Sequence, residues 1–339
     1  MKLVFKPVAA VILALAMTPL AAKPYCEALL DKAALPEKYA RIAPIYSDAD
    51  TGWIFASNQL RQSYEMKDKP QALMDRIVAG FEARGAKLAI LVAPPRPVIA
   101  GQGVLRRTMG QAAEDYNVQA ARDSFLTLLA DLRSSGAMVP DLQSMVLADP
   151  ELRRRYYFRR DTHWTTVGAV RSAEALAATI AETHPDLIAY QRDIVVEWKG
   201  KIEEKGSLSA VVQKVCGERP KREVARTAVL ASAGVDLLSD MVAVHKPVAL
   251  VGTSFSDRYK RDHYRVADAL AASLGVEVEN HSKSGGGMTG SMLAFLASGQ
   301  LESGAHDLVI WELPYTQNFN STKRLGQIVK ALESRPMTN

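Results

Sequence analysis

Three unbroken apolar runs constrain the fold of this chain more than any other feature. They are Lys87-Leu-Ala-Ile-Leu-Val-Ala93, Pro247-Val-Ala-Leu-Val251 and Asp307-Leu-Val-Ile-Trp-Glu312. Runs without polar alternation are typical of strands buried on both faces, and segments with helical spacing separate these runs along the chain. The alternation predicts an α/β fold, a three-layer α/β/α sandwich built on a mainly parallel sheet.

The remaining elements follow from the spacing of apolar residues and from turn signals. Residues 190–245 mix a strand pattern with charged and short apolar pieces, and we interpret them as an insertion or small subdomain. Thr165 is the expected N-cap of a helix over residues 166–183. Other helices are expected over residues 70–84, 111–134, 259–274 and 288–298, and other strands over 53–55, 137–141, 194–198 and 276–279.

The first residues have the pattern of a secretory signal. Lys2 and Lys6 precede an apolar stretch from Val8 to Ala22, which ends in the small residues that a signal peptidase accepts. Its 15 residues fall short of the roughly 20 that a membrane-spanning helix needs. We therefore expect residues 1–22 to be a cleaved signal peptide, with a retained anchor as the alternative. Residues 23–339 should then form a single periplasmic domain.

Cys26 and Cys216 are the two cysteines of the chain. In an oxidising compartment such a pair predicts one disulfide, which would join the start of the mature chain to its middle. The alternative is two separate buried thiols.

The charge of the chain is mildly basic. The formal net charge of +5 falls to +3 when Lys2 and Lys6 leave with the signal peptide. This balance does not indicate a nucleic-acid partner, although it permits an anionic polysaccharide.

A serine follows the apolar run that ends at Val251. In Gly252-Thr-Ser254, the glycine allows a sharp turn and is a candidate for the oxyanion or substrate site. Ser254 would project from the carboxyl end of a parallel strand. Open α/β sheets bind their ligands at this edge, so Ser254 is a candidate nucleophile. The alternative is a serine that only caps the next helix.

Asp161-Thr-His163 is the second candidate motif. Asp161 can fix the tautomer of His163 while the other ring nitrogen faces a serine. The alternative is an aspartate that caps the following helix, beside a packed histidine. The spacing of the six histidines shows no HxH or HExxH pattern, so we expect no metal and no cofactor.

Three further groups are candidates for binding substrate. Gly286, in the glycine run after Asn280, can supply a backbone N–H to an oxyanion, the alternatives being a phosphate site or a plain turn. Trp164 and Tyr259 can stack on sugar rings or pack in the core. Five arginines precede His163 and form either a solvated helix face or a site for sugar groups: Arg153, Arg154, Arg155, Arg159 and Arg160.

Taken together, these motifs resemble a known family. The order of a strand with Gly-x-Ser, a strand with a glycine-rich loop and then Asp-Leu-Val-Ile is similar to SGNH (GDSL-like) hydrolases, where the histidine normally comes last. With the histidine first, the blocks Asp-Thr-His-Trp, Gly-Thr-Ser-Phe-Ser, Ser-Gly-Gly-Gly and Val-Ile-Trp-Glu-Leu-Pro resemble the AlgX/AlgJ group of alginate O-acetyltransferases. Gly52-Trp-Ile-Phe55 resembles the N-terminal block of that group, and the resemblance covers about residues 45–320.

The resemblance implies an SGNH-like domain in which Ser254 is the nucleophile, His163 the base and Asp161 its partner. Two features depart from the family pattern. Glu312-Leu-Pro314 stands where the superfamily has its oxyanion asparagine, so backbone N–H groups near Ser254 and Gly286 must serve instead. Because the sequence ends soon after the last expected strand, we also expect no C-terminal carbohydrate-binding module of the kind that AlgX carries.

We therefore expect an enzyme that moves an acetyl group through Ser254 onto hydroxyls of an exopolysaccharide such as alginate. The resemblance implies a membrane-bound O-acyltransferase as acetyl supplier and a polysaccharide export complex as a partner. Two alternatives remain. One is an acetyl esterase that uses the same three residues, and the other is a non-catalytic scaffold of the export complex.

Overall fold

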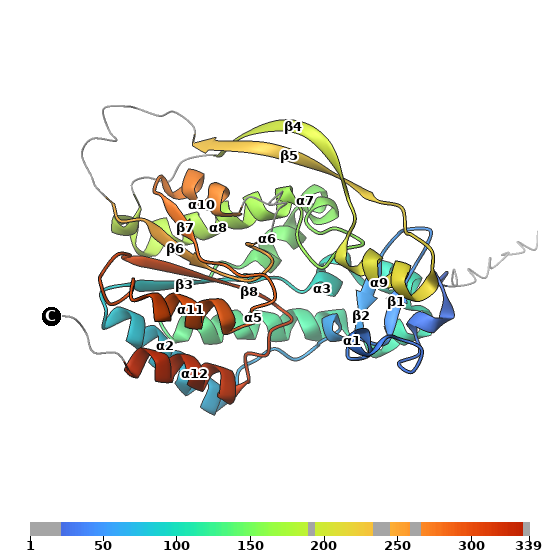
Figure 1. Ribbon diagram of the computed structural model, residues 1–339, viewed down its shortest axis with the longest axis horizontal. Coiled ribbons are helices and arrows are strands. Elements are labelled where there is room, and N and C mark those ends of the chain that lie inside the picture. The colour runs from blue at the N-terminus through green and yellow to red at the C-terminus, as the bar shows by residue number, and fades with distance from the viewer. Residues whose placement is uncertain (1–21, 189–193, 233–244, 258–265, 335–339) are drawn as a thin grey trace, which may run out of the picture.

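A four-stranded parallel sheet runs through the centre of the computed structural model, which describes residues 22–188, 194–232, 245–257 and 266–334 (Figure 1). The strand order is β3-β8-β6-β7, and each neighbouring pair is parallel. The three apolar runs form its long and central strands, and the predicted parallel sheet is confirmed. The strands are β3 (Lys87–Ala93), β6 (Val248–Val251), β7 (Val278–Asn280) and β8 (Leu308–Pro314).

Helices cover both faces of this sheet (Figure 1). Alternate strand residues point to opposite faces, so Ile90 and Trp311 join one apolar core and Leu91 and Ile310 the other. The three-layer sandwich is therefore confirmed. One face carries α2 (Asp68–Glu82), α5 (Val118–Ser134), α11 (Gly290–Ser298) and α12 (Thr322–Glu333), and the other α6 (Leu142–Ala148), α7 (Pro150–Arg155), α8 (Thr166–Thr183) and α10 (Val266–Leu274).

Several predicted elements differ in the structure. The helix expected over 111–134 is divided, because the Asn117 side chain caps α5 by accepting the Ala120 N–H at 3.0 Å. The strand expected over 137–141 is a single bridge between Met138 and Ala89. The first part of the helix expected over 259–274 lies outside the described residues. Shorter helices were not predicted: η2 (Ser57–Gln59), α3 (Arg96–Ala100), α4 (Gln102–Met109), η3 (Gly110–Asp115) and η4 (Pro185–Leu187).

The region interpreted as an insertion folds into a ribbon and a helix. β4 (Ile194–Glu204) pairs antiparallel with β5 (Glu223–Ser232), and α9 (Ser207–Cys216) connects them. The ribbon arches over α8 and α10, whereas α9 lies beside β1 and β2 at the right-hand end of the view (Figure 1). The part of the predicted insertion at residues 233–244 lies outside the described residues.

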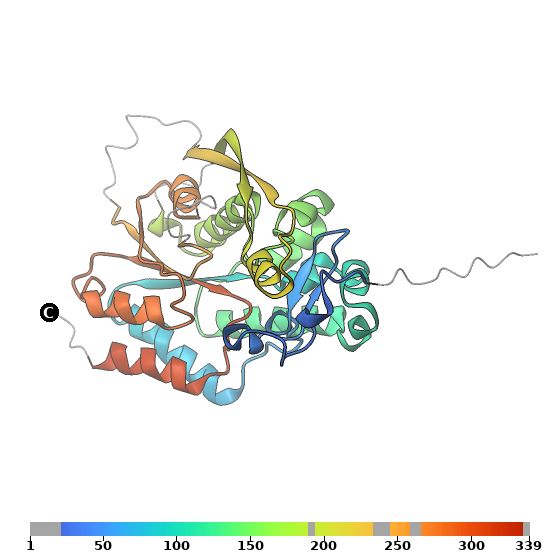
Figure 2. The same cartoon turned by 45° about the vertical axis from the view of Figure 1, so that its right-hand side comes forward.

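A small N-terminal lobe packs against α9 (Figure 2). Leu29, Ile45 and Ile54 form a separate apolar cluster with Leu208 and Val212 of α9. A disulfide joins the lobe to the end of this helix, so the predicted bond between the two cysteines of the chain is confirmed. The lobe consists of η1 (Glu27–Leu29), α1 (Glu37–Ala40) and the antiparallel pair β1 (Ile45–Ser47) and β2 (Ile54–Ala56).

The predicted signal peptide lies outside the described residues, apart from Ala22. Within the described ranges, none of the helices combines the length and the apolar character needed to cross a bilayer.

Removal of the disulfide should destabilise the protein. The bond joins residues 190 positions apart in sequence, and loss of a cross-link over a long loop costs about 2–5 kcal/mol of unfolding free energy. Cys26→Ser, Cys216→Ser and the double variant should therefore share one lowered midpoint in urea. Wild-type protein with a reductant should shift to that midpoint, and an unchanged midpoint in the single variants would contradict the prediction.

Candidate active site

Ser254 lies on the turn that follows β6, at the carboxyl edge of the sheet. The turn rests on Glu312 of the central strand β8. The carboxylate of Glu312 accepts the Thr253 N–H at 2.7 Å and the Thr253 hydroxyl at 3.1 Å. The nucleophile candidate is thus fixed to the middle of the sheet through its neighbour in sequence.

Gly252 is required for space in this turn. A Cβ atom at this position would lie 2.6 Å from Glu312 Oε2 and 2.9 Å from Ser282 Oγ. The Gly252 carbonyl accepts the Ser291 hydroxyl at 2.6 Å and the Lys283 N–H at 3.1 Å. The glycine therefore lets the turn pack between β8 and the loop that follows β7.

The Glu312 side chain is fully buried. Burial raises the pKa of Glu312 from its ordinary value of 4.5 to about 7, and the hydrogen bonds from Thr253 limit this rise. A carboxyl group beneath the nucleophile turn thus titrates near neutral pH.

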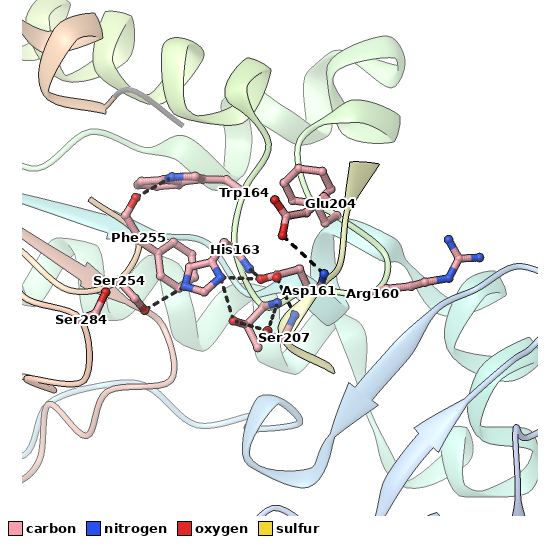
Figure 3. A network of polar contacts seen from close by, with 12 residues as sticks. Arg160, Asp161, His163, Trp164, Glu204, Ser207, Ser254, Phe255 and Ser284 are labelled. Atoms are coloured by element: carbon pink, nitrogen blue, oxygen red, sulfur yellow. Dashed lines mark hydrogen bonds and ion pairs between the residues drawn. The ribbon is translucent and has the colours of Figure 1, made fainter. Parts of the chain in front are cut away.

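His163 and Asp161 lie on the loop between α7 and α8, and both are buried. Figure 3 shows their side chains in a row with Ser254. His163 Nε2 is 2.8 Å from Ser254 Oγ, and Nδ1 contacts Asp161 Oδ1. Because a carboxylate only accepts, Nδ1 carries the proton and Nε2 accepts the Ser254 hydroxyl. The structure therefore brings all three predicted residues together.

The Asp161 carboxylate is also bound by α9. Its Oδ2 accepts the Ser207 N–H at 2.6 Å, and its Oδ1 accepts the His163 N–H at 3.0 Å. Ser207 is the first residue of α9, where a carboxylate is favoured by the unpaired N–H groups and the helix dipole. Sequence reasoning missed Ser207, because it lies in the region without a clear pattern.

Arg96 supports the loop that carries His163. Its buried guanidinium donates to the carbonyls of Phe158 and Ile54, at 3.0–3.1 Å and 2.7 Å. It also lies over the rings of Trp53 and Phe55, at 4.9 and 4.7 Å. The N-terminal block that resembles the family therefore supports the loop that carries His163.

Phe255 and Trp164 pack around the histidine ring. Phe255 lies 4.7 Å from His163 between ring centroids, and the Trp164 indole N–H donates to the Phe255 carbonyl at 3.1 Å. Trp164 is fully buried. The suggestion that it stacks on a sugar is therefore wrong, because the ring supports the turn from inside the core.

A pocket of about 250 Å³ opens beside Ser254. Gly285 and Gly287 line it together with Thr162 and Tyr315. Gly286, predicted as an oxyanion donor, is absent from the lining of this pocket, and its N–H donates to the Lys283 carbonyl at 3.1 Å. That prediction is wrong for Gly286, because the turn uses its N–H, whereas its two neighbours face the pocket.

The predicted Arg160 does not line this pocket. The Arg160 side chain points away from Ser254 (Figure 3) and lies against Gly52, where a Cβ atom would be 2.1 Å from its Nη2. Arg160 instead lines a second pocket of about 410 Å³ with Arg154, Arg155, Arg159 and Arg226. Tyr259 lies outside the described residues.

The geometry suits nucleophilic acyl chemistry. A serine hydroxyl within hydrogen-bond reach of a histidine, which a buried carboxylate orients in turn, is the arrangement that activates a serine. Such a group can accept an acyl group from one alcohol and pass it to another alcohol or to water.

Comparisons with known proteins agree on the family. A family model described as "SGNH hydrolase-like domain, acetyltransferase AlgX" matches residues 48–315. The alginate biosynthesis protein AlgX of Pseudomonas putida is 26% identical over 297 residues, which cover 85% of this chain and 60% of that protein. The chain thus spans about three fifths of this curated relative.

Two solved structures share the fold. The structure of Pseudomonas aeruginosa AlgX is similar with a TM-score of 0.74 and 21% identity, covering 91% of this chain and 70% of that one. The O-acetyltransferase domain of Pseudomonas putida AlgJ has a TM-score of 0.63 and 22% identity, covering 86% and 99%. The predicted SGNH hydrolase-like fold is confirmed.

The raised pKa of Glu312 makes stability depend on pH. The folded protein holds the Glu312 proton more tightly than the unfolded chain does. The resulting contribution to the free energy of unfolding is complete below pH 4.5 and is lost as the pH rises to about 7. Glu312→Gln lacks this loss, so the unfolding free energy of wild type relative to the variant should fall by about 3 kcal/mol across that window. Urea unfolding at several pH values measures it.

The matched control is Glu277→Gln, because the Glu277 side chain is exposed. This variant should follow the wild type at every pH. A constant difference between wild type and Glu312→Gln would show that Glu312 titrates normally.

Proposed function

Because the chain belongs to the AlgX family of SGNH hydrolase-like acetyltransferase domains, we propose that it transfers acetyl groups through Ser254 onto polysaccharide hydroxyls. One observation carries the proposal: His163 Nε2 lies 2.8 Å from Ser254 Oγ, while Nδ1 on the other side of the ring contacts Asp161. Metal ions and cofactors have no part in the reaction proposed.

In the first half-reaction, Ser254 Oγ attacks the carbonyl carbon of an acetyl ester. His163 Nε2 takes the hydroxyl proton, and the resulting imidazolium is stabilised by Asp161. The tetrahedral intermediate then collapses, the bond to the donor oxygen breaks, and His163 returns its proton to the departing alcohol. The acetyl group remains on Ser254 as an ester.

In the second half-reaction, a sugar hydroxyl replaces the departed alcohol. His163 removes the proton of this hydroxyl, and the sugar oxygen attacks the acetyl carbonyl. Collapse of the second intermediate releases the acetylated sugar and returns the proton to Ser254 Oγ. Transfer prevails over hydrolysis when the bound sugar excludes water from the pocket.

Backbone N–H groups are the proposed oxyanion donors. Ser254 and Gly287 both line the pocket, and no hydrogen bond from either N–H to another residue is found in the described part of the chain. Two preorganised N–H groups suit the developing negative charge. This assignment replaces Gly286 with its neighbour Gly287.

The proposed acceptor is an exopolysaccharide of the alginate type. Its support is the similarity to proteins described as alginate biosynthesis protein AlgX and as the O-acetyltransferase domain of AlgJ. We further propose a periplasmic location after removal of residues 1–22. The acetyl group would come from a membrane-bound O-acyltransferase, within a polysaccharide export complex.

Three substitutions test the catalytic roles. Ser254→Ala, His163→Ala and Asp161→Asn should each lower acetyl release from a generic acetyl ester by about 10⁴-fold or more, since the members of such a triad act as a unit. Ser144→Ala, in α6 and outside the lining of the pocket, is the control and should match wild type. Unchanged release by Ser254→Ala would favour the scaffold alternative.

The same assay separates transfer from hydrolysis when oligosaccharide acceptors are added. Uronate and neutral glucan oligomers are incubated with wild-type enzyme and donor ester, and mass spectrometry follows both sugars and acetate. Acetylated sugar that accumulates faster than acetate supports a transferase. Unmodified acceptors, together with loss of acetyl from preacetylated ones, identify an esterase.

Ser207 supplies a second test, because its N–H and its hydroxyl contact different residues. The N–H donates to Asp161, and the hydroxyl accepts the Thr162 N–H at 3.3 Å. Ser207→Ala keeps the N–H that Asp161 accepts, whereas Ser207→Pro removes it at the one helical position where proline is well tolerated. Hydrogen bonds to charged groups contribute about 1.5–3 kcal/mol, so kcat should fall roughly 10- to 150-fold in Ser207→Pro alone. Equal kcat values for the two variants would contradict a role for this contact.

A further inference from the structure

Three potential metal ligands meet between β7 and α11, in a cluster that the proposed function does not use. Glu279 lies in β7, His281 follows this strand, and His306 precedes β8. Their side-chain ligand atoms all lie within 4.8 Å of one another. Glu279 and His281 are two positions apart, but His306 follows 25 positions later, so no short spacing motif reveals the cluster.

The distances suit a small tetrahedral cation. Glu279 Oε2 lies 3.4 Å from His281 Nε2 and 3.8 Å from His306 Nε2. With zinc bonds of about 2.0–2.1 Å, tetrahedral ligand atoms lie about 3.3–3.4 Å apart. Small side-chain rotations therefore bring all three atoms to coordination distance.

His306 is oriented for coordination. Its Nδ1 is 2.7 Å from the Pro247 carbonyl, which only accepts, so Nδ1 carries the proton and the lone pair of Nε2 faces the cluster. A backbone carbonyl bound to the far ring nitrogen is the usual support of a metal-binding histidine. The His306 side chain is fully buried, with 0% exposure.

The facing ring nitrogens lack other partners. Both His281 Nε2 and His306 Nε2 are buried without a hydrogen-bond partner in the described part of the chain. Buried polar atoms are rarely left unpaired, because the loss of hydration destabilises the fold. A ligand shared by both rings would satisfy them at once.

Phe295 of α11 supports the two rings. Its centroid lies 5.2 Å from that of His281 and 5.8 Å from that of His306. This apolar wall closes one side of the cluster, while Glu279 and His281 keep side-chain exposures of 36% and 25%. A cation can therefore enter from solvent.

The main rival is an ion pair between Glu279 and a protonated histidine. Both nitrogen–oxygen distances exceed those of a good hydrogen bond. The geometry thus fits a shared cation better than a direct pair.

We infer that Glu279, His281 and His306 form a zinc(II) site with an open fourth position. Two imidazole nitrogens and one carboxylate are ligands that zinc prefers, whereas magnesium and calcium prefer oxygen alone. Bound zinc would tie the edge strand β7 to the segment that enters the central strand β8. The inference is independent of the proposed acetyl transfer.

Zinc titration of the chelator-treated protein tests the site. Wild type should bind one equivalent of zinc chloride by isothermal titration calorimetry, with a rise in Tm. Glu279→Gln and His281→Gln, at half-exposed positions, should each weaken zinc binding by more than about 100-fold. Loss of a residue that only hydrogen-bonds to a metal ligand typically weakens binding by about 10- to 100-fold. The controls Glu277→Gln and His184→Gln should bind as wild type does.

A last variant excludes the acetyl-transfer site as the source of binding. His163→Ala should keep the full equivalent, whatever its effect on activity. The inference would be overturned if wild type bound no zinc at a 100-fold molar excess, or if both ligand variants bound zinc as wild type does. It would also be overturned if His163→Ala lost the bound zinc while His281→Gln retained it.

Discussion

The buried carboxylate of Asp161 is the interaction on which the rest of the site depends. One oxygen accepts the His163 N–H and the other the Ser207 N–H, at 3.0 and 2.6 Å. Such a charge is tolerated in the interior only while donors surround it, so the His163 loop and α9 must meet. Glu223 strengthens this meeting, because its carboxylate accepts the backbone N–H groups of Arg159 and Arg160. β4, β5 and α9, which interrupt the βα alternation, therefore hold the loop that carries the proposed base His163.

The two halves of the proposed site are held in different ways. Ser254 stands on the sheet, because Glu312 of β8 binds the turn directly before it. His163 instead belongs to a loop among helices, and its position depends on α9, on Arg96 and on the ring of Phe255. The N-terminal lobe is therefore linked to the histidine side of the site, because it packs on α9 and is joined to that helix by the disulfide.

Sequence patterns predicted the central sheet, since burial on both faces leaves an unbroken apolar run. They failed where one side chain decides the outcome, as when Asn117 divides a helix that apolar spacing made continuous. Ser254 and His163 could be proposed because a reactive residue type stood at a strand end or beside an acid. Ser207 could not, because it contributes a backbone N–H that any residue except proline carries. The cluster around His306 could not be predicted either, because His306 comes close to Glu279 and His281 only when β7 and β8 are in place.

The strand order also determines when the central sheet can be completed during folding. β8 lies between β3 and β6, yet it is the last strand in the described part of the chain. While the chain is being synthesised, β3 has no partner in this sheet and β6 has only β7. The sheet therefore closes only when β8, about 220 residues after β3 in sequence, pairs with it. Such long-range pairing is slow and leaves apolar strand edges unpaired until then. Glu312 arrives with this strand, so the platform beneath Ser254 is among the last parts to be built. A nascent or shortened chain that lacks the final strand should thus be both inert and prone to aggregate.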